Sequence, residues 1–167
     1  MSAKENILNA IAKNQPELIP LPVIDIVSVI QYEDLFAQFK TVLESIGGKV
    51  QLISDVSVLK EQLLADKSSG SFVVNTIKAL GELDTNVASF TASELEKLDK
   101  AYIEGTVGVA ENGAVWIYES QMIHRLVPFI CQHLVLLIEK KSIVATLHQA
   151  YEKIEVAEEG FGVFLAG

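Results

Sequence analysis

Cysteine and arginine are almost missing from the 167-residue sequence, and each occurs once, as Cys131 and Arg125. A single cysteine excludes an internal disulfide framework and cannot supply the four thiolates of a structural zinc site or an iron–sulfur cluster. Cysteine usage of this kind favours a reducing compartment, so we expect a cytoplasmic protein.

Positive charge is also scarce. Thirteen basic residues against 22 acidic ones give a formal net charge of −9. Nucleic acids and anionic membrane surfaces attract clustered cations. The composition therefore disfavours a nucleic-acid-binding protein.

The sequence lacks long apolar runs as well. Its most apolar segment, residues 126–138, is interrupted by Pro128, Gln132 and His133. A membrane-spanning helix needs about 20 apolar residues. We therefore expect a core element here and no membrane insertion.

Glycine-rich phosphate motifs and nucleophile elbows are absent: the sequence contains no G-x-G-x-x-G, no G-x-x-x-x-G-K-[ST] and no G-x-S-x-G. A dinucleotide-binding dehydrogenase, a P-loop NTPase and an α/β-hydrolase would each need one of these. With one cysteine and no nucleotide motif, the chain is expected to bind no redox cofactor itself.

An amphipathic helix and a proline-rich connector open the chain. Ser2 and Glu5 have the spacing of a capping box at the start of a helix over residues 2–14. Three of the four prolines follow within residues 16–22 and favour an extended connector. We predict an N-terminal arm over residues 1–22 and a main body over residues 23–167.

Alternating helix and strand patterns fill the first part of the body. Apolar residues recur at helical spacing from Glu33 to Ile46 and stop at two glycines, and Asp55 is a plausible N-cap. The predicted elements are a helix over 33–46, strands over 49–54 and 72–74, and helices over 55–66 and from 93. This alternation favours an α/β fold with a largely parallel sheet.

One antiparallel feature interrupts that pattern. Apolar β-rich runs at 106–110 and 114–119 flank Glu111-Asn112-Gly113, and Asn-Gly between such runs predicts a hairpin whose two turn residues both take positive φ. A strand over 134–138, buried on both faces, a helix over 142–154 and a last strand over 161–165 follow.

Glu111 and Arg125 are the residues to which we give chemical roles, each with a simpler alternative. Glu111 is either the first residue of a tight hairpin or a carboxylate at the mouth of a pocket, where it would act as a general base or bind a hydroxyl or amine group. Arg125 either pairs with a carboxylate or is the one planar donor able to grip an anionic ligand in two places.

A metal site is not expected. Cys131 and His133 would share one face of a strand near His124, but the three lack the local spacing of known zinc sites. A packed thiol and a hydrogen-bonded imidazole are the alternative. His148 is expected to face solvent.

The segment Gly108-Val-Ala-Glu-Asn-Gly-Ala-Val115 resembles the LUD-domain family, the LutC/YkgG proteins of bacterial lactate utilisation, whose core reads roughly A-E-[ST]-G-[ST] before an apolar strand. The order of the next landmarks agrees: Arg125-Leu-Val-Pro128, His133-Leu-Val135 and Ile143-Val144. The resemblance covers residues 100–167 well and the earlier pattern loosely.

Three departures from the family pattern concern the ligand site. Asn112 and Ala114 stand where the family has hydroxyl residues, and Pro128 lies five residues before His133 instead of three. Gly167 would match the first glycine of a G-P-S-x-T-A-D-I-E loop, and the loop and following strand of the family are missing from this chain. The candidate ligand-binding residues are Glu111, Asn112, Gly113, Arg125, His133 and Gly167.

The resemblance implies a three-layer α/β fold similar to the sugar-phosphate isomerase and CoA-transferase (NagB/RpiA-like) superfamily. It also implies a role in the oxidation of L-lactate to pyruvate, beside partner subunits that carry iron–sulfur clusters. With this resemblance we expect a non-redox accessory subunit that has a small-anion pocket near Glu111, Arg125 and His133. The alternatives are a stand-alone enzyme binding a sugar phosphate or CoA thioester, with Glu111 as base or nucleophile, and a structural interaction domain that forms a homo-oligomer through its arm.

Overall fold

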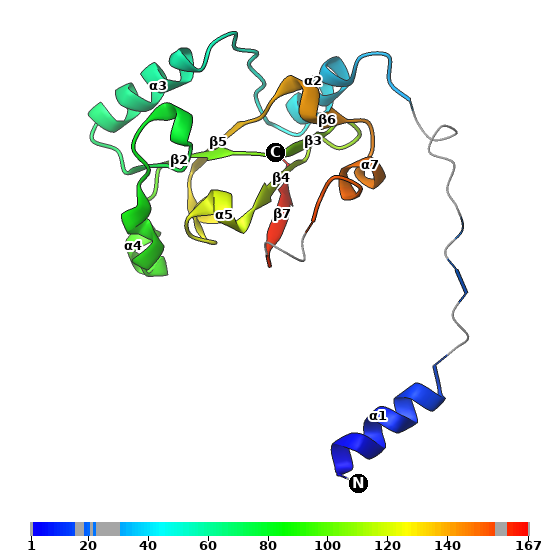
Figure 1. Cartoon of the computed structure of the whole chain (residues 1–167). Helices are drawn as coiled ribbons and strands as arrows, with labels where there is room; N and C mark the ends of the chain where they lie inside the picture. Colours follow the sequence, from blue (N-terminus) through cyan, green and yellow to red (C-terminus); the bar gives the residue numbers. More distant parts are fainter. Residues whose placement is uncertain (1, 16–18, 21, 23–30, 156–159, 167) are drawn as a thin grey trace.

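The structure of the chain is a computed structural model that describes residues 2–15, 19–20, 22, 31–155 and 160–166. It has a mixed α/β fold, as the sequence predicts, with its parallel strands divided between two sheets (Figure 1). The predicted N-terminal helix is present as α1 (Ala3–Lys13), with the Ser2–Glu5 capping box formed. The predicted arm–body boundary near residue 23 lies outside the described residues.

The first sheet, called sheet A, is entirely parallel. Its strand order is β1 (Val73–Asn75), β2 (Lys100–Glu104) and β5 (His133–Leu137). The register pairs Val74 with Ala101 and Ala101 with Leu134. β1 and β5 both pair with β2, so Val74 and Leu134, which are 60 positions apart in sequence, lie on either side of Ala101 in the sheet.

The second sheet, called sheet B, is mixed. Its order is β6 (Ile143–Val144), β3 (Val107–Val109), β4 (Val115–Tyr118) and β7 (Gly162–Leu165). β3 and β4 form the predicted antiparallel hairpin, β6 is parallel to β3, and β7 is antiparallel to β4. Only two residues, Gly105 and Thr106, separate β2 from β3, so one length of chain contributes to both sheets.

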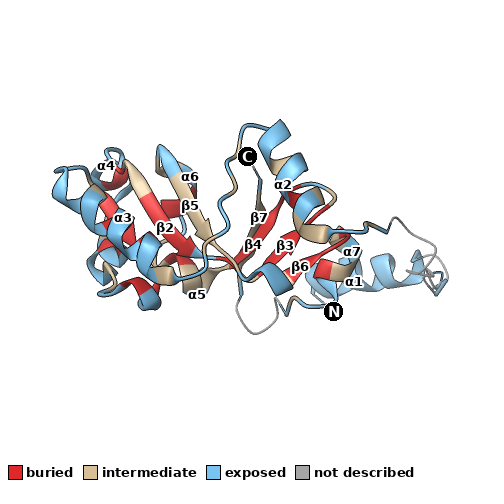
Figure 2. Ribbon diagram, turned by 90° about the horizontal axis from the view of Figure 1, so that it is seen from above, coloured by how far each residue is buried: buried red, intermediate tan, exposed pale blue. Residues whose placement is uncertain are grey.

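Helices cover both faces of each sheet. On sheet A, α3 (Val56–Ser68) packs Leu59 and Leu63 against Tyr102, while α4 (Ala92–Leu95), α5 (Glu119–Met122) and α6 (Val127–Ile130) lie on the other face. On sheet B, α2 (Leu35–Ser45) and α7 (Leu147–Tyr151) cover opposite faces. Short 3-10 helices are Lys78–Leu80, Thr85–Ser89 and Lys140–Ser142. Figure 2 shows the buried residues concentrated in the central strands.

The helices predicted at 33–46 and 55–66 are confirmed, because their local signals are strong. Asp34 caps α2 by accepting hydrogen bonds from two backbone N–H groups, and Asp55 caps α3 in the same way through one. Gly47 has a φ of 101° after the end of α2, a conformation that suits glycine at a helix C-terminus.

The strand predicted over 49–54 is wrong. This segment connects α2, which covers sheet B, to α3, which covers sheet A. Val50 packs into the core under α2 and Ile53 into the core under α3, while Leu52 is 63% exposed. Its apolar residues therefore face two different cores and do not pair with a strand.

The helix predicted over 142–154 is too long. Ile143 and Val144 form β6, where they pair with Gly108 and Val109, and Thr146 caps the short α7. Pairing with β3 buries two β-branched residues that the helical pattern had placed in the helix.

The strands predicted over 134–138 and 161–165 are both present, but the burial predicted for the first is wrong. β5 exists, but it pairs only with β2 in the described part of the chain, so its apolar residues are half-buried and not buried on both faces. β7 confirms the last predicted strand within one residue. No helix among the described residues has the length and apolar character needed to cross a membrane.

Candidate functional site

Glu111 lies at the tip of the β3–β4 hairpin and is tied to the segment joining β6 and α7. Its backbone N–H donates to the Ala145 carbonyl at 3.1 Å, and its carboxylate Oε1 accepts the Leu147 N–H at 2.7 Å. Leu147 is the first residue of α7, whose free N–H groups favour an anionic acceptor. The carboxylate thus holds the hairpin against α7, and a role as general base stays a prediction.

Asn112 and Gly113 complete the turn in a different way from the predicted one. Only Gly113 has a positive φ, of 70°, and its N–H donates to the Val109 carbonyl at 2.9 Å. Asn112 is exposed, and its side-chain oxygen accepts the Ala114 N–H at 3.0 Å. The hydrogen-bonded turn therefore spans five residues, Val109 to Gly113, and not the four of a β-turn. Asn112 does not adopt a positive φ.

Gly113 also touches another element. A Cβ built on Gly113 would lie 3.1 Å from the Leu43 Cα and 3.2 Å from its backbone nitrogen, in α2. The glycine is thus required twice, for its φ and for the close approach of the hairpin to α2.

Arg125 pairs with a carboxylate, which is the simpler of its two predicted roles. Its Nε and one terminal nitrogen donate to the two Glu119 oxygens at 2.7 and 2.8 Å, and its guanidinium lies 5.1 Å from the centre of the Phe161 ring. The hydrogen bonds lower the pKa of Glu119 and raise the pKa of Arg125. Two donor groups of the only arginine are therefore occupied within the chain.

A strained turn precedes Arg125. Ile123 has φ 62° and ψ −47°, and the His124 N–H donates to the Met122 carbonyl at 2.7 Å, which defines a γ-turn with positive φ. A β-branched residue rarely adopts this conformation. Met122 is fully buried and Ile123 packs against the same core, so packing holds the turn. Nothing in the sequence signals it, because isoleucine is among the least expected residues here.

The candidate residues do not meet in one pocket. Glu111 lies at the hairpin tip, whereas Glu119, the partner of Arg125, follows β4 at the open end of the same hairpin. His133 is exposed at the start of β5, beside Lys100 at the start of β2. Gly167 lies outside the described residues.

Burial raises the pKa of the Cys131 thiol, which favours its protonated form. The described residues contain no group of three or more histidine, cysteine or acidic side chains placed to hold a metal ion. His148 is exposed, as predicted.

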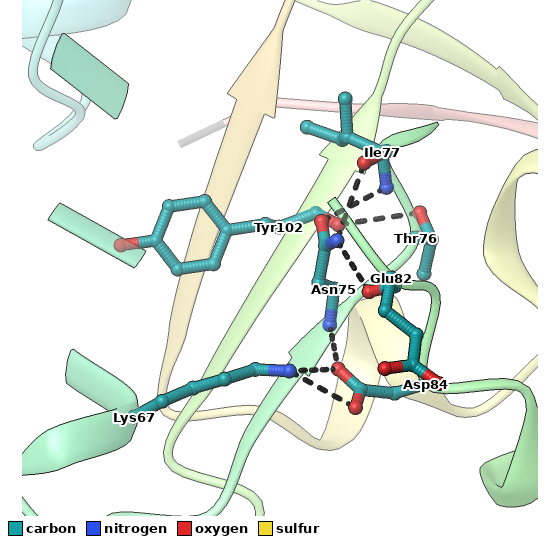
Figure 3. Close-up of polar contacts among 7 residues, drawn as sticks. All are labelled: Lys67, Asn75, Thr76, Ile77, Glu82, Asp84 and Tyr102. Atoms are coloured by element: carbon teal, nitrogen blue, oxygen red, sulfur yellow. Dashed lines mark hydrogen bonds and ion pairs between the residues drawn. The ribbon is translucent and has the colours of Figure 1, made fainter. Parts of the chain in front are cut away.

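A polar network that the sequence analysis missed organises the loop after β1 (Figure 3). The fully buried Asn75 side chain donates to the Ile77 and Glu82 carbonyls at 3.2 and 3.0 Å and accepts the Ile77 N–H at 3.0 Å. Asp84 accepts the Asn75 N–H at 2.7 Å and forms an ion pair with Lys67, also at 2.7 Å. A signal existed, since Asn75 directly follows a predicted strand, where parallel sheets place their ligands. Here the Asn75 side chain instead forms hydrogen bonds with backbone groups of the loop that follows β1.

A second network joins α3 to β2. The Asp66 carboxylate accepts hydrogen bonds from the Tyr102 hydroxyl and, at 2.8 Å, from the Lys100 ammonium. Burial alone would raise the pKa of Asp66, but these two hydrogen bonds outweigh it and lower the pKa below its usual value. Burial and the carboxylate together raise the pKa of Tyr102. The network fixes α3 on sheet A.

Comparisons with known proteins support the resemblance seen in the sequence. Residues 91–162, which are less than half of the chain, match the LUD domain. The fold is similar to the crystal structure of a DUF162 family protein from Deinococcus radiodurans, with a TM-score of 0.64 and 16% sequence identity over 79% of this chain and 86% of that one. The search of curated proteins found no match. The segment that matches the LUD domain includes the β3–β4 hairpin, with β2 before it and β5 and β6 after it.

Proposed function

We propose that this LUD-domain chain belongs to a lactate-utilisation system of the cytoplasm and acts there as a non-redox accessory subunit in the oxidation of L-lactate to pyruvate. The observation that carries the proposal is the match of residues 91–162 to the LUD domain. The order of short motifs around Glu111, Arg125 and His133 agrees with the LutC/YkgG members of that family.

The contacts of the candidate residues support an accessory role over a catalytic one. Glu111 accepts a hydrogen bond from the α7 backbone, and Arg125 is paired with Glu119 in a bidentate ion pair. One cysteine is too few for an iron–sulfur cluster, so electrons from lactate would pass through partner subunits that carry such clusters. Among the residues that the structure describes, no contact favours a stand-alone enzyme acting on a sugar phosphate or CoA thioester.

The test begins with an anaerobic pull-down of the tagged full-length chain from its native lysate, followed by mass spectrometry and iron analysis. We expect cysteine-rich iron–sulfur proteins to co-elute, and deletion of the gene to abolish growth on L-lactate. A partnerless protein together with unimpaired growth of the deletion strain would overturn the proposal.

A Glu111→Gln variant separates the accessory role from catalysis. Glutamine keeps a side-chain oxygen that accepts the Leu147 N–H, so the fold is expected to persist, while a general base or nucleophile is lost. The accessory role predicts that the variant still assembles with its partners and restores growth on lactate. Intact assembly without growth would instead assign chemistry to Glu111.

A further inference from the structure

Asn112 is the only asparagine in the sequence that is followed by a glycine, and it lies exposed at the tip of the β3–β4 hairpin. Asparagine is among the thermally labile residues, because the next backbone nitrogen is able to attack its side-chain amide. A glycine in the next position has no side chain to hinder this attack and lets the backbone rotate into it. Asn112 and Gly113 therefore carry the groups for a spontaneous modification of the chain.

The folded hairpin holds both reacting groups in other contacts. The Gly113 N–H, which has to lose its proton for the attack, donates to the Val109 carbonyl at 2.9 Å. The Asn112 side-chain oxygen accepts the Ala114 N–H at 3.0 Å, which fixes the orientation of the amide. The reaction therefore requires the turn to open first, and its rate depends on the fraction of molecules in which the hairpin tip is open.

Two neighbouring elements keep the tip closed. The Glu111 N–H donates to the Ala145 carbonyl, and the Glu111 carboxylate accepts the N–H of Leu147, the first residue of α7. The buried Gly113 lies against α2, where an added Cβ would come within 3.1 Å of the Leu43 Cα. Because α2 and α7 cover opposite faces of sheet B, the tip is held from both faces.

We propose that Asn112 is a deamidation site, and that docking of the hairpin tip on α2 and α7 controls how fast it reacts. The Gly113 nitrogen loses its proton and bonds to the Asn112 Cγ, the bond from Cγ to the side-chain nitrogen breaks, and ammonia leaves. Water then opens the five-membered imide ring. Cleavage of the bond between Cγ and the Gly113 nitrogen leaves aspartate, whereas cleavage of the backbone C–N bond leaves isoaspartate. Solvent water is the only co-reactant.

Isoaspartate at position 112 releases the tip. In this product the chain runs through Cβ and Cγ, so the backbone before Gly113 becomes longer. Gly113 already lies against the Leu43 backbone and has no room to shift toward α2. The added length therefore displaces Glu111 from the Leu147 N–H. The modification thus changes the tip irreversibly from docked to released, and the proposal does not depend on the lactate-related function.

Incubation of the full chain for several weeks near neutral pH and at physiological temperature, with and without urea, tests the site. Mass spectrometry of the peptide that contains residue 112, together with an isoaspartate-specific methyltransferase assay, measures both products. We expect both to form at position 112, at least about tenfold more slowly in the folded chain than in urea, because only a minority of folded molecules have an open tip. An Asn112 that stays unmodified in the folded chain, or that reacts equally fast in both conditions, would overturn the proposal.

Two substitutions separate opening of the tip from a general loss of stability. Glu111→Ala removes the carboxylate that binds α7, so Asn112 should react several-fold faster in the folded chain. Asp66→Asn weakens the contact between α3 and sheet A, away from the hairpin, and should leave the folded-state rate unchanged. In urea both variants should react at the wild-type rate, which controls for a direct effect of the residue beside Asn112. Equal acceleration of the folded chains by the two substitutions would refute control by the tip.

Discussion

Two carboxylates in this acidic protein accept hydrogen bonds that join elements far apart in sequence. Asp66 on α3 accepts from Lys100 and Tyr102 on β2, and Glu111 accepts from Leu147 on α7. These partners are 34 to 36 residues apart. Such an acceptor stabilises the fold only while it is ionised and its donors remain in place.

Asp66 should make stability depend on pH in the acid range. Its folded-state pKa is lowered, so the carboxylate stabilises the fold above its ordinary pKa of about 3.9 and this contribution disappears as pH falls through the lower folded-state value. We expect Asp66→Asn to reduce the free energy of unfolding by about 2 kcal/mol near neutral pH. The difference from wild type should shrink as the pH is lowered toward about 3.

Urea unfolding at a series of pH values measures this effect. Glu61→Gln is the control. Glu61 is exposed on the same helix, and this substitution removes one negative charge from a similar position. A difference between wild type and Asp66→Asn that stays constant from neutral to acid pH would contradict the role given to the carboxylate.

At the scale of helices and strands, local sequence signals predicted what local interactions determine. The N-cap residue Asp55 and the helix-ending Gly47 correctly predicted two helices, and Asn112-Gly113 correctly predicted the hairpin. The signals failed where a distant partner decides the structure. Ile143 and Val144 follow a helical pattern but form a strand that pairs with β3. Within residues 49–54, no pattern indicates that Val50 and Ile53 pack into two different hydrophobic cores.

The candidate site shows the same limit. Sequence reasoning gave Arg125 a carboxylate partner as one of two alternatives without identifying Glu119, and it offered no partner for Glu111. The Leu147 N–H becomes an available donor only because α7 begins there, after β6 has paired with β3. Asn75 was missed because its network depends on a loop that closes around it.

The contact between the hairpin and α2 can be tested with two glycines. Gly70 and Gly113 have positive φ values of 84° and 70°, but a Cβ on Gly70 meets nothing within 4 Å, whereas one on Gly113 meets the Leu43 backbone. Alanine at either position should cost about 1 kcal/mol for the backbone conformation. Gly113→Ala should cost about 1–3 kcal/mol more, because α2 must move. Equal losses in the free energy of unfolding by urea would show that the hairpin and α2 do not pack closely.

The molecule as a whole is larger than the segment that matches the LUD domain. That segment, residues 91–162, contains β2 to β6 and only the first residue of β7, and it leaves out α2, α3 and β1. The missing elements supply Phe39 to the core under α2, and Leu59, Leu63 and Val73 to the core under α3. One face of each sheet would thus be exposed to water in the isolated segment.

We therefore expect a fragment of residues 91–162 not to fold alone, and a chain beginning at residue 31 to fold. Sheet A in the fragment would lose an edge strand and the 13-residue helix that covers Tyr102, and burial of each large apolar side chain contributes about 1.5–3 kcal/mol. The net stability of a domain is only about 5–15 kcal/mol, so loss of several such side chains exceeds it. Thermal unfolding followed by circular dichroism, with amide NMR spectra of both chains, measures the difference. A cooperative transition and dispersed amide signals in the fragment would show that the matched segment is an autonomous domain, and that α2, α3 and β1 are additions to it and not parts of its core.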